Sequence, residues 1–241
     1  MILVNDLRKS FGARPVLTGL DLAVDPGVVT LMVGSNGAGK TTALRLIAGL
    51  SDPDAGKIAI DGHDLRDART AALARLSFLP QAPRFHPRLT VLQVAGFYAR
   101  LRGRPASVVP AALDAWGMCE FEKVPTGKLS GGLRQRLALA IFSLADAPVL
   151  LLDEPGLSLD PEWRQSLQHF LRHEASRGRT VLVATHLLGE WEGRADRCLL
   201  IERGRSQGEL PPDRLREYFP RLSREPDGNA TGSIEAGASR T

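Results

Sequence analysis

The chain has 241 residues, 43% of them hydrophobic, and its 31 Lys and Arg against 27 Asp and Glu give a formal net charge of +4. That length accommodates one large α/β domain or two small ones, and a mild charge with scattered arginines makes a weak case for nucleic-acid binding. No apolar window spans a membrane without interruption, and residues 1–6 lack the features of a signal peptide, so we expect a cytosolic protein.

Apolar runs in the first third of the chain predict short strands around a glycine-rich loop. Residues 34–42 read Gly-Ser-Asn-Gly-Ala-Gly-Lys-Thr-Thr, and apolar residues at helical spacing follow at 43, 44, 46 and 47. A Gly-x-x-x-x-Gly-Lys-Thr sequence between a strand and a helix is the context of a phosphate-binding loop. The strands predicted here cover residues 2–7, 16–24, 28–33, 57–60 and 76–79.

The loop carries the chemistry that a triphosphate needs. Its glycines can adopt positive φ and bring backbone N–H groups close to phosphate oxygens, and the helix start adds unpaired N–H groups. Lys40 can reach the β- and γ-phosphates, and the Thr41 hydroxyl can ligate Mg²⁺. A glycine-rich turn with a chance lysine fits the spacing less well. We expect the nucleotide to bind at Gly34, Ser35, Asn36, Gly37, Ala38, Gly39, Lys40, Thr41 and Thr42.

Helical patterns dominate the middle of the chain. Thr90 and Gln93 form a predicted capping box at the start of a helical stretch that extends to residue 118. The pattern then predicts, in order, a helix at about 132–145, a strand at 149–152, a helix from 161 to 176 after an Asp160 cap, and a strand at 180–184.

This order of elements predicts two lobes within a single domain of residues 1–222. One lobe is a nucleotide-binding core, and the other is a helical subdomain at about residues 82–145. Residues 223–241 are rich in Gly, Ser, Ala and Asn and have almost no large apolar side chain, so we expect a disordered tail there.

Two carboxylates follow the predicted strand at 149–152. Four apolar residues in a row are typical of a central buried strand, whose end lies beside the phosphate loop in an open α/β sheet. Asp153 would then help to hold Mg²⁺ through water, and Glu154 would lie next to the γ-phosphate and polarise the attacking water. A strand end with solvated acids is the alternative when the phosphate loop is ignored.

Residues 129–136, Leu-Ser-Gly-Gly-Leu-Arg-Gln-Arg, resemble the signature motif of ATP-binding-cassette (ABC) ATPases, at that family's usual distance before the two acids. The resemblance implies that Ser130, Gly131 and Gly132 act on the ATP held by a partner subunit, as an anion site at a helix start. The motif departs from many members at Leu133, where Gln is common, and at Gly156, where Thr or Ser is usual.

The resemblance extends to further single positions. It implies that Phe11 stacks on adenine, and that Gln81 senses Mg²⁺ and the γ-phosphate and hinges the helical subdomain. It also implies that the loop at 158–160 crosses the dimer interface, and that His186 contacts the γ-phosphate and positions the water. Phe85, Phe97 and Tyr98 are apolar enough to line the groove that, in the family, receives a helix of the membrane subunit.

Together these features predict an α/β fold with a P-loop nucleoside-triphosphatase core, a mixed sheet, a small antiparallel β region and an inserted helical subdomain. The resemblance implies an ATPase that uses ATP and Mg²⁺, forms a head-to-tail dimer of two copies, and powers transport through separate integral membrane subunits. It would be cytoplasmic and peripheral on the inner face of the cell membrane.

A soluble ABC ATPase acting on nucleic acid or ribosomes is the alternative. It is disfavoured because the sequence has no long coiled coil between its motifs, no zinc-binding cysteine insert and a single cassette, so no nucleic-acid partner is expected. Within the family the chain looks most like compact export-type subunits, including the ATPases of nitrous-oxide reductase maturation and of haem export. The transported substrate stays open.

Overall fold

The structure, a computed structural model, describes residues 1–213 and 215, so the tail expected at 223–241 lies outside the described residues. In the described part the strands form two sheets. The smaller sheet is antiparallel and has the order β2-β1-β4-β5, with hydrogen-bonded pairing throughout. Its strands are β1 (Ile2–Phe11), β2 (Arg14–Val24), β4 (Ala55–Ile60) and β5 (His63–Asp64).

The larger sheet has the order β10-β9-β3-β8-β7-β6 and is parallel except for the pair of β9 and β10. Every residue of its three central strands is buried, as expected when both faces of a parallel sheet are covered. The strands are β3 (Val29–Val33), β6 (Leu76–Leu79), β7 (Val149–Asp153), β8 (Thr180–Ala184), β9 (Arg197–Glu202) and β10 (Arg205–Leu210).

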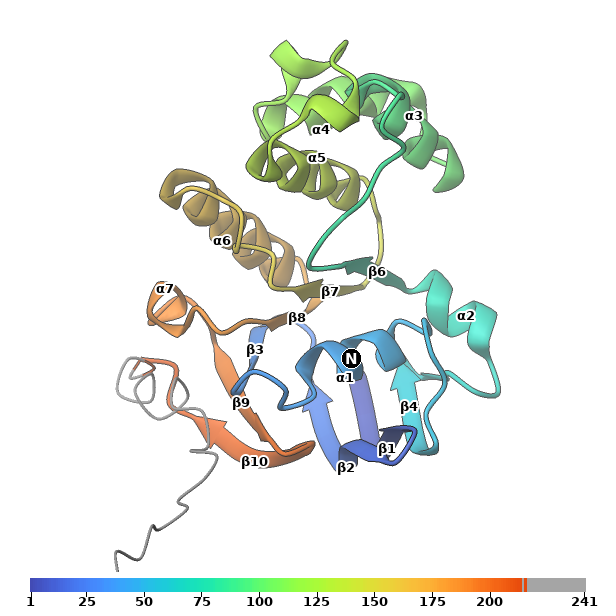
Figure 1. The fold of residues 1–241 in the computed structure, drawn as a ribbon, viewed down its shortest axis with the longest axis vertical. Coiled ribbons are helices and arrows are strands. Elements are labelled where there is room, and N and C mark those ends of the chain that lie inside the picture. Colours follow the sequence, from blue (N-terminus) through green and yellow to red (C-terminus); the bar gives the residue numbers. More distant parts are fainter. Residues whose placement is uncertain (214, 216–241) are drawn as a thin grey trace, which may run out of the picture.

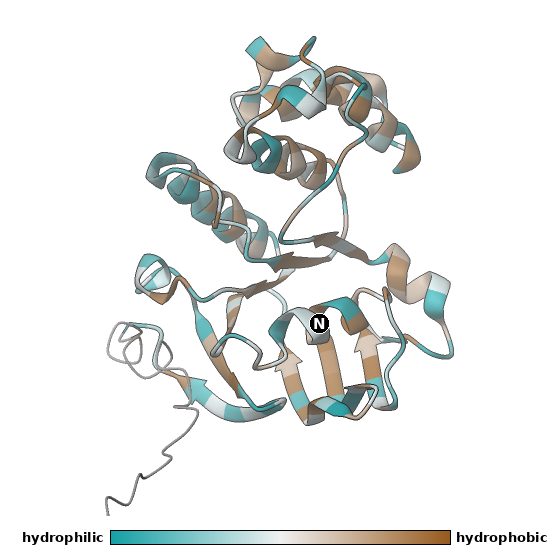
Figure 2. Ribbon diagram, viewed as in Figure 1, coloured by the Kyte–Doolittle hydropathy of each residue, from teal (hydrophilic) through white to brown (hydrophobic). Residues whose placement is uncertain are grey.

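The two faces of the larger sheet belong to different hydrophobic clusters. Leu150 and Leu152 of β7 pack into the cluster that contains α5 (Gly131–Ser143) and α6 (Pro161–Ser176). Val149 and Leu151 pack into the cluster that contains α1 (Lys40–Ile47) and the smaller sheet. Alternate residues of a strand point to opposite faces, so one continuous apolar run serves both clusters. Figure 2 shows the contrast with the surface, because β6 and β7 are hydrophobic while α6 carries many hydrophilic residues.

The helices α3, α4 and α5 form a group that lies apart from α1 and the smaller sheet (Figure 1). Helix α3 begins with the predicted capping box, in which Thr90 Oγ1 accepts from Gln93 N–H and Gln93 Oε1 accepts from Thr90 N–H. The α-helices are α1 (Lys40–Ile47), α2 (Arg69–Ala74), α3 (Val91–Leu101), α4 (Val109–Ala115), α5 (Gly131–Ser143), α6 (Pro161–Ser176) and α7 (Leu188–Trp191), and short 3₁₀ turns cover Ala106–Val108, Cys119–Phe121 and Thr126–Lys128.

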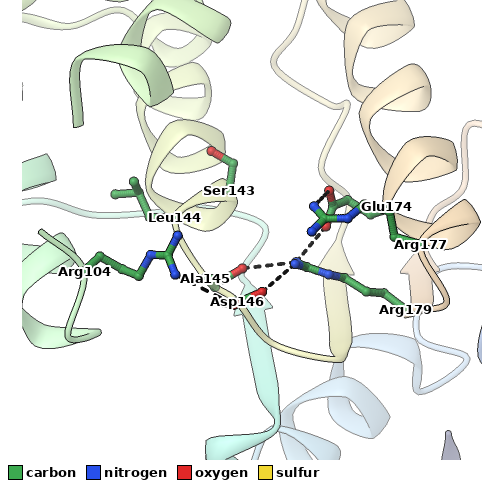
Figure 3. A pocket seen from close by; sticks show the side chains of 8 residues that line it. All are labelled: Arg104, Ser143, Leu144, Ala145, Asp146, Glu174, Arg177 and Arg179. Atoms are coloured by element: carbon green, nitrogen blue, oxygen red, sulfur yellow. Dashed lines mark hydrogen bonds and ion pairs between the residues drawn. The ribbon is translucent and has the colours of Figure 1, made fainter. Parts of the chain in front are cut away.

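An arginine network joins this helical group to the sheet. Arg179 precedes β8 and donates to the Ala145 carbonyl at 3.2 Å, while it pairs with Asp146 at 2.7 Å and with Glu174 at 2.7 Å. Arg104, from the loop after α3, lies 3.8 Å from the other Asp146 oxygen. Figure 3 shows these side chains around a polar pocket of about 170 Å³, lined by Arg104, Ser143, Leu144, Ala145, Asp146, Glu174, Arg177 and Arg179.

The charges of this pocket are balanced. Its three guanidinium groups face two carboxylates and the C-terminal ends of α5 and α6, where the last carbonyls carry partial negative charge. The pocket lies at the edge of the larger sheet where β7 and β8 begin, opposite the edge where these strands end. The network therefore connects the two parts of the fold without creating an anion site.

Replacing Arg179 by Met should lower the free energy of unfolding by about 3 kcal/mol, because it removes the nearer of the two guanidinium groups that pair with the buried Glu174 carboxylate and leaves only Arg177 at 3.5 Å. The side chains of Arg179 and Glu174 are only 13% and 6% exposed. The double variant Arg179→Met/Glu174→Met should recover most of the loss. Arg8→Met, which breaks an exposed pair with Asp6, is the control and should cost less than about 1 kcal/mol. Urea unfolding measures all three, and equal losses in the single and double variants would contradict the account.

Candidate nucleotide-binding site

The glycine-rich loop connects β3 to α1 and has the backbone shape that the sequence predicts. Gly37 and Gly39 have φ of +81° and +106°, a region that side chains disfavour. A Cβ at Gly39 would come within 2.7 Å of a Leu17 methyl group, and one at Gly34 within 2.1 Å of the Ile201 carbonyl oxygen. Glycine is therefore required at Gly34 and Gly39 for close packing against β9 and β2, and at Gly37 and Gly39 for the turn.

Helix α1 starts at this loop without a side-chain cap. Its N-cap is Gly39, which offers no side-chain acceptor to the N–H groups of the first turn. Such groups, together with the positive end of the helix dipole, favour an anion at this position. The loop thus presents backbone donors where the sequence predicts a phosphate.

Lys40 is buried inside the loop. Its Nζ donates to the carbonyl oxygens of Gly34 at 2.7 Å and Ser35 at 3.1 Å, and only 7% of the residue is exposed. Burial lowers the pKa of the ammonium group, while the carboxylates of Glu154 and Asp153 act in the opposite direction. The cation is held by neutral carbonyls rather than by a direct ion pair, which leaves its charge available to an incoming phosphate.

Asp153 is the last residue of β7 and faces the loop. The Thr41 hydroxyl, at the start of α1, donates to Asp153 Oδ1 at 3.2 Å, and Asp153 is 2% exposed. Burial raises the pKa of this carboxyl group, and the Thr41 hydrogen bond acts against the rise. A hydroxyl beside a carboxylate matches the oxygen ligands that Mg²⁺ prefers.

Glu154 follows directly and makes two contacts with His186. Glu154 Oε1 lies 2.8 Å from His186 Nδ1, and Glu154 Oε2 accepts from the His186 backbone N–H at 3.3 Å. Glu154 has φ of +48° and is 7% exposed, whereas the His186 side chain is 40% exposed. A non-glycine residue at positive φ is strained, and such strain is frequent at functional sites.

Gln81 and Phe11 lie at the margins of this region. Gln81 is exposed two residues beyond β6, and Leu79 of β6 pairs with Leu152 of β7, so Gln81 follows the same sheet edge as Asp153. Phe11 ends β1, is 57% exposed, and has the Lys9 ammonium 5.7 Å from its ring centre. An exposed ring at this end of the hairpin is accessible for stacking.

The signature segment lies away from the phosphate loop. Ser130 caps α5, since its Oγ accepts from Leu133 N–H at 3.2 Å, and both Ser130 and Gly131 are exposed. Gly132 packs close to the Ser158 carbonyl, because a Cβ there would lie 3.0 Å from that oxygen. Helix α5 belongs to the helical group, away from α1 (Figure 1). The structure therefore does not bring the signature to the phosphate loop of the same chain.

One contact between the signature helix α5 and the loop after Glu154 was not predicted from the sequence. Gln135, in the signature helix, is 2% exposed and donates through Nε2 to the Pro155 carbonyl at 3.0 Å. The contact ties α5 to the loop directly after Glu154. Its signal was weak, because a glutamine inside a helical motif usually indicates a solvated position.

The described residues contain no group of three or more His, Cys, Asp or Glu side chains that could hold a metal ion. Thr41 and Asp153 supply a hydroxyl and one carboxylate, so a cation bound there would complete its shell with phosphate and water oxygens. That is the usual situation of Mg²⁺ bound together with a nucleotide.

Comparisons with known proteins identify the family. Residues 17–156 match the family model described as ABC transporter. Nod factor export ATP-binding protein I of Burkholderia lata is 36% identical over 218 residues, covering 88% of this chain and 71% of that protein. The protein of the same description from Rhizobium etli is 34% identical, covering 88% and 68%.

Solved structures give the same answer at the level of the fold. An ATP-binding subunit of an ABC transporter superposes with a TM-score of 0.82 at 26% identity, covering 93% of this chain and 95% of that chain. A bacterial Atm1-family ABC exporter with ATP bound gives 0.81 at 26% identity, covering 93% of this chain and 42% of that chain.

The chain belongs to the ABC transporter family. It has the P-loop nucleoside-triphosphatase fold expected from its sequence, and it is an ATP-binding and ATP-hydrolysing transporter subunit. Among the helices of the described residues, none is long and apolar enough to cross a membrane.

Asp153 should make the free energy of unfolding of the nucleotide-free chain depend on pH. Because burial raises its pKa, the folded state binds the proton more tightly than the unfolded state, and stability falls as pH rises from the unfolded pKa of about 4 through the folded pKa. Asp153→Asn should remove that fall and raise the free energy of unfolding at pH 7 by about 1 kcal/mol. Urea unfolding at several pH values measures this, with exposed Asp67→Asn as control. A less stable Asp153→Asn chain would contradict the prediction.

Proposed function

We propose that this chain forms a head-to-tail dimer in which each ATP lies between the phosphate loop of one copy and the signature segment of the other. The observation that supports this most is the separation of the two halves within one chain. Ser130 and Gly131 are exposed at the start of α5. Helix α5 lies apart from α1, the helix that follows the phosphate loop (Figure 1). A second copy in the opposite orientation can supply the missing half to each loop.

The nucleotide half of the site would work as follows. The β- and γ-phosphate oxygens replace the carbonyls of Gly34 and Ser35 as partners of the Lys40 ammonium, while the N–H groups of Gly34–Thr42 surround the phosphates. Phe11 stacks on the adenine. Thr41 and Asp153, with Gln81 at the margin, would hold Mg²⁺, which would supply charge neutralisation for the phosphates.

Hydrolysis is assigned to the pair of Glu154 and His186. The Glu154 carboxylate accepts a hydrogen bond from the attacking water and orients it towards the γ-phosphorus. His186 contacts Glu154 through both its ring and its backbone, so it fixes the carboxylate and offers its exposed ring edge to the γ-phosphate. In the partner copy, Ser130, Gly131 and Gly132 stabilise negative charge on the same phosphate.

The transport step would follow from this division. ATP holds the two copies together, and hydrolysis releases them. The helices between residues 82 and 145, which we propose act as a subdomain hinged near Gln81, pass the motion to integral membrane subunits. The relatives from Burkholderia lata and Rhizobium etli carry export in their names, which supports an export system. We place the chain on the cytoplasmic face of the membrane.

The variant Glu154→Gln tests the hydrolytic assignment. It should lower kcat for ATP hydrolysis about 1,000-fold, because the amide cannot act as a base, while ATP binding persists. Phosphate release at saturating ATP measures the rate, and light scattering after gel filtration should show an ATP-dependent dimer. Exposed Glu162→Gln is the control and should behave like the parent chain. Hydrolysis by Glu154→Gln at the parent rate would remove Glu154 from the mechanism.

The partner class is tested separately by purification of the tagged chain from its own cells in a mild detergent. Polypeptides with membrane-spanning segments should co-purify in stoichiometric amounts, and their association should survive nuclease treatment. Co-purification of ribosomes or nucleic acid, with no membrane protein, would contradict the transporter assignment and favour the soluble alternative.

A further inference from the structure

A guanidinium group is stacked on an aromatic ring where α4, α5 and α6 meet. The Arg136 guanidinium lies 4.0 Å from the centre of the Trp163 ring. Its Nε donates to the Trp116 carbonyl at 2.8 Å, and a second nitrogen donates to the Gly117 carbonyl. The Trp116 and Trp163 rings are 6.2 Å apart. One planar cation of α5 thus contacts both the end of α4 and the first turn of α6.

The cluster is closed on its remaining side by Gly117. This residue has φ of +58°, and a Cβ there would lie 2.2 Å from an Arg136 nitrogen and 2.8 Å from a Trp163 ring carbon. Only glycine leaves room for the guanidinium to reach both carbonyls. Although Arg136 is only partly buried, its guanidinium group is held by the Trp163 ring and by the two carbonyl groups.

Both ends of this contact lead to segments of the proposed ATP site. Arg136 is on the helix that Ser130 caps, so its position governs where the signature segment begins. Trp163 is in the first turn of α6, directly after the 158–160 loop, and its backbone N–H donates to Asp160 Oδ1 at 3.0 Å. The stack links the two segments that the proposed dimer places at its interface.

A second contact makes the orientation of α5 unique. Gln135 and Arg136 are adjacent, so their side chains point about 100° apart around the helix. Gln135 is held by the Pro155 carbonyl after Glu154, and Arg136 is held by Trp163 on α6. Two anchors in different directions prevent the helix from rotating about its own axis.

We propose that Arg136 and Trp163 are positioning residues of the composite ATP site. Their cation–π stack holds the signature segment at a fixed angle to the 158–160 loop, so that Ser130–Gly132 meet the partner's γ-phosphate when the dimer closes. This inference rests on the proposed function. It adds that the signature's geometry is set by an aromatic contact remote from the nucleotide.

The test compares ATP-driven dimer formation in chains that all carry Glu154→Gln. Trp163→Leu removes the ring, Trp163→Phe keeps a weaker one, and Arg136→Lys keeps the charge but loses the planar fork. Phe170→Leu is the matched control, because Phe170 packs edge-on against Trp116 at 5.7 Å outside the guanidinium stack. Fluorescent ATP binding to the single chain and Tm are measured beside light scattering.

Trp163→Leu and Arg136→Lys should raise the ATP concentration for half-maximal dimerisation about tenfold, with single-chain ATP binding unchanged. Trp163→Phe should recover most of that loss, and Phe170→Leu should dimerise like the parent even where its Tm falls. In chains with Glu154 intact, Trp163→Leu and Arg136→Lys should lower kcat for ATP hydrolysis while the nucleotide affinity of the single chain stays constant.

Some results would overturn the inference alone. These are dimerisation of both Trp163→Leu and Arg136→Lys at the parent ATP concentration, or an equal loss in Phe170→Leu, which would indicate general packing. If the Glu154→Gln parent itself forms no dimer with ATP, the proposed function is wrong and the inference fails with it. ATP-driven dimerisation of the chain that carries only Glu154→Gln therefore distinguishes failure of this inference from failure of the proposed function.

Discussion

The site depends on three neighbouring parallel strands that end at the same edge of a buried sheet. Strands β3, β8 and β7 are adjacent, and each is buried along its whole length. Strand β3 leads into the phosphate loop, β7 ends on Asp153, and β8 leads to His186. Because the strands are parallel and in register, their carboxyl ends deliver these chemically different residues to one place. The smaller sheet and α1 cover one face, and α5 and α6 cover the other.

Burial at this edge gives the site its electrostatic character. Lys40, Asp153 and Glu154 are each less than a tenth exposed, and their charges are close enough to influence one another. Burial opposes the charged form of both Lys40 and Asp153, so the nucleotide-free site is an unfavourable environment that a phosphate and a cation would relieve. The helix start and the strained Glu154 backbone add to this cost. The stability that the apolar strands supply is what permits such a site to persist.

Much of this arrangement could be predicted from the sequence, and the reasons differ between elements. The central strands are continuous apolar runs, so the predictions at 28–33, 149–152 and 180–184 agree with the structure to within one residue. The helix starts at Thr90 and Asp160 were readable because a capping side chain acts within three residues. Helix α2 was missed because it is short and its N-cap, Ala68, supplies no side-chain hydrogen bond.

Contacts between distant segments were harder to predict. Strands β9 and β10 lie beyond the last motif, and β9 pairs with β3 from more than 160 residues away, which no local pattern encodes. The predicted strand at 2–7 extends to Phe11 because its polar residues pair with β2 across the turn at residues 12 and 13. In the site, the residues of the loop and the two acids were identifiable by spacing, but the hydrogen bonds of Glu154 to His186 and of Gln135 to Pro155 depend on the folded chain. The catalytic roles of these residues stay predictions.

The division of the ATP site places a particular demand on the fold. If each half of the site belongs to a different copy, the geometry of the assembled site depends on two rigid connections. One is the sheet edge at which β3, β7 and β8 end, and the other is the contact between α5 and α6. The first is a parallel sheet with ladder hydrogen bonds. The second connection contains no strand pairing, because it joins two helices and α5 lies with α3 and α4 (Figure 1). Directional side-chain contacts, the buried Gln135 and the stacked Arg136, take that place. A helix that was held by apolar packing alone could rotate by fractions of a turn at little cost, and its N-terminal donors would then miss the phosphate.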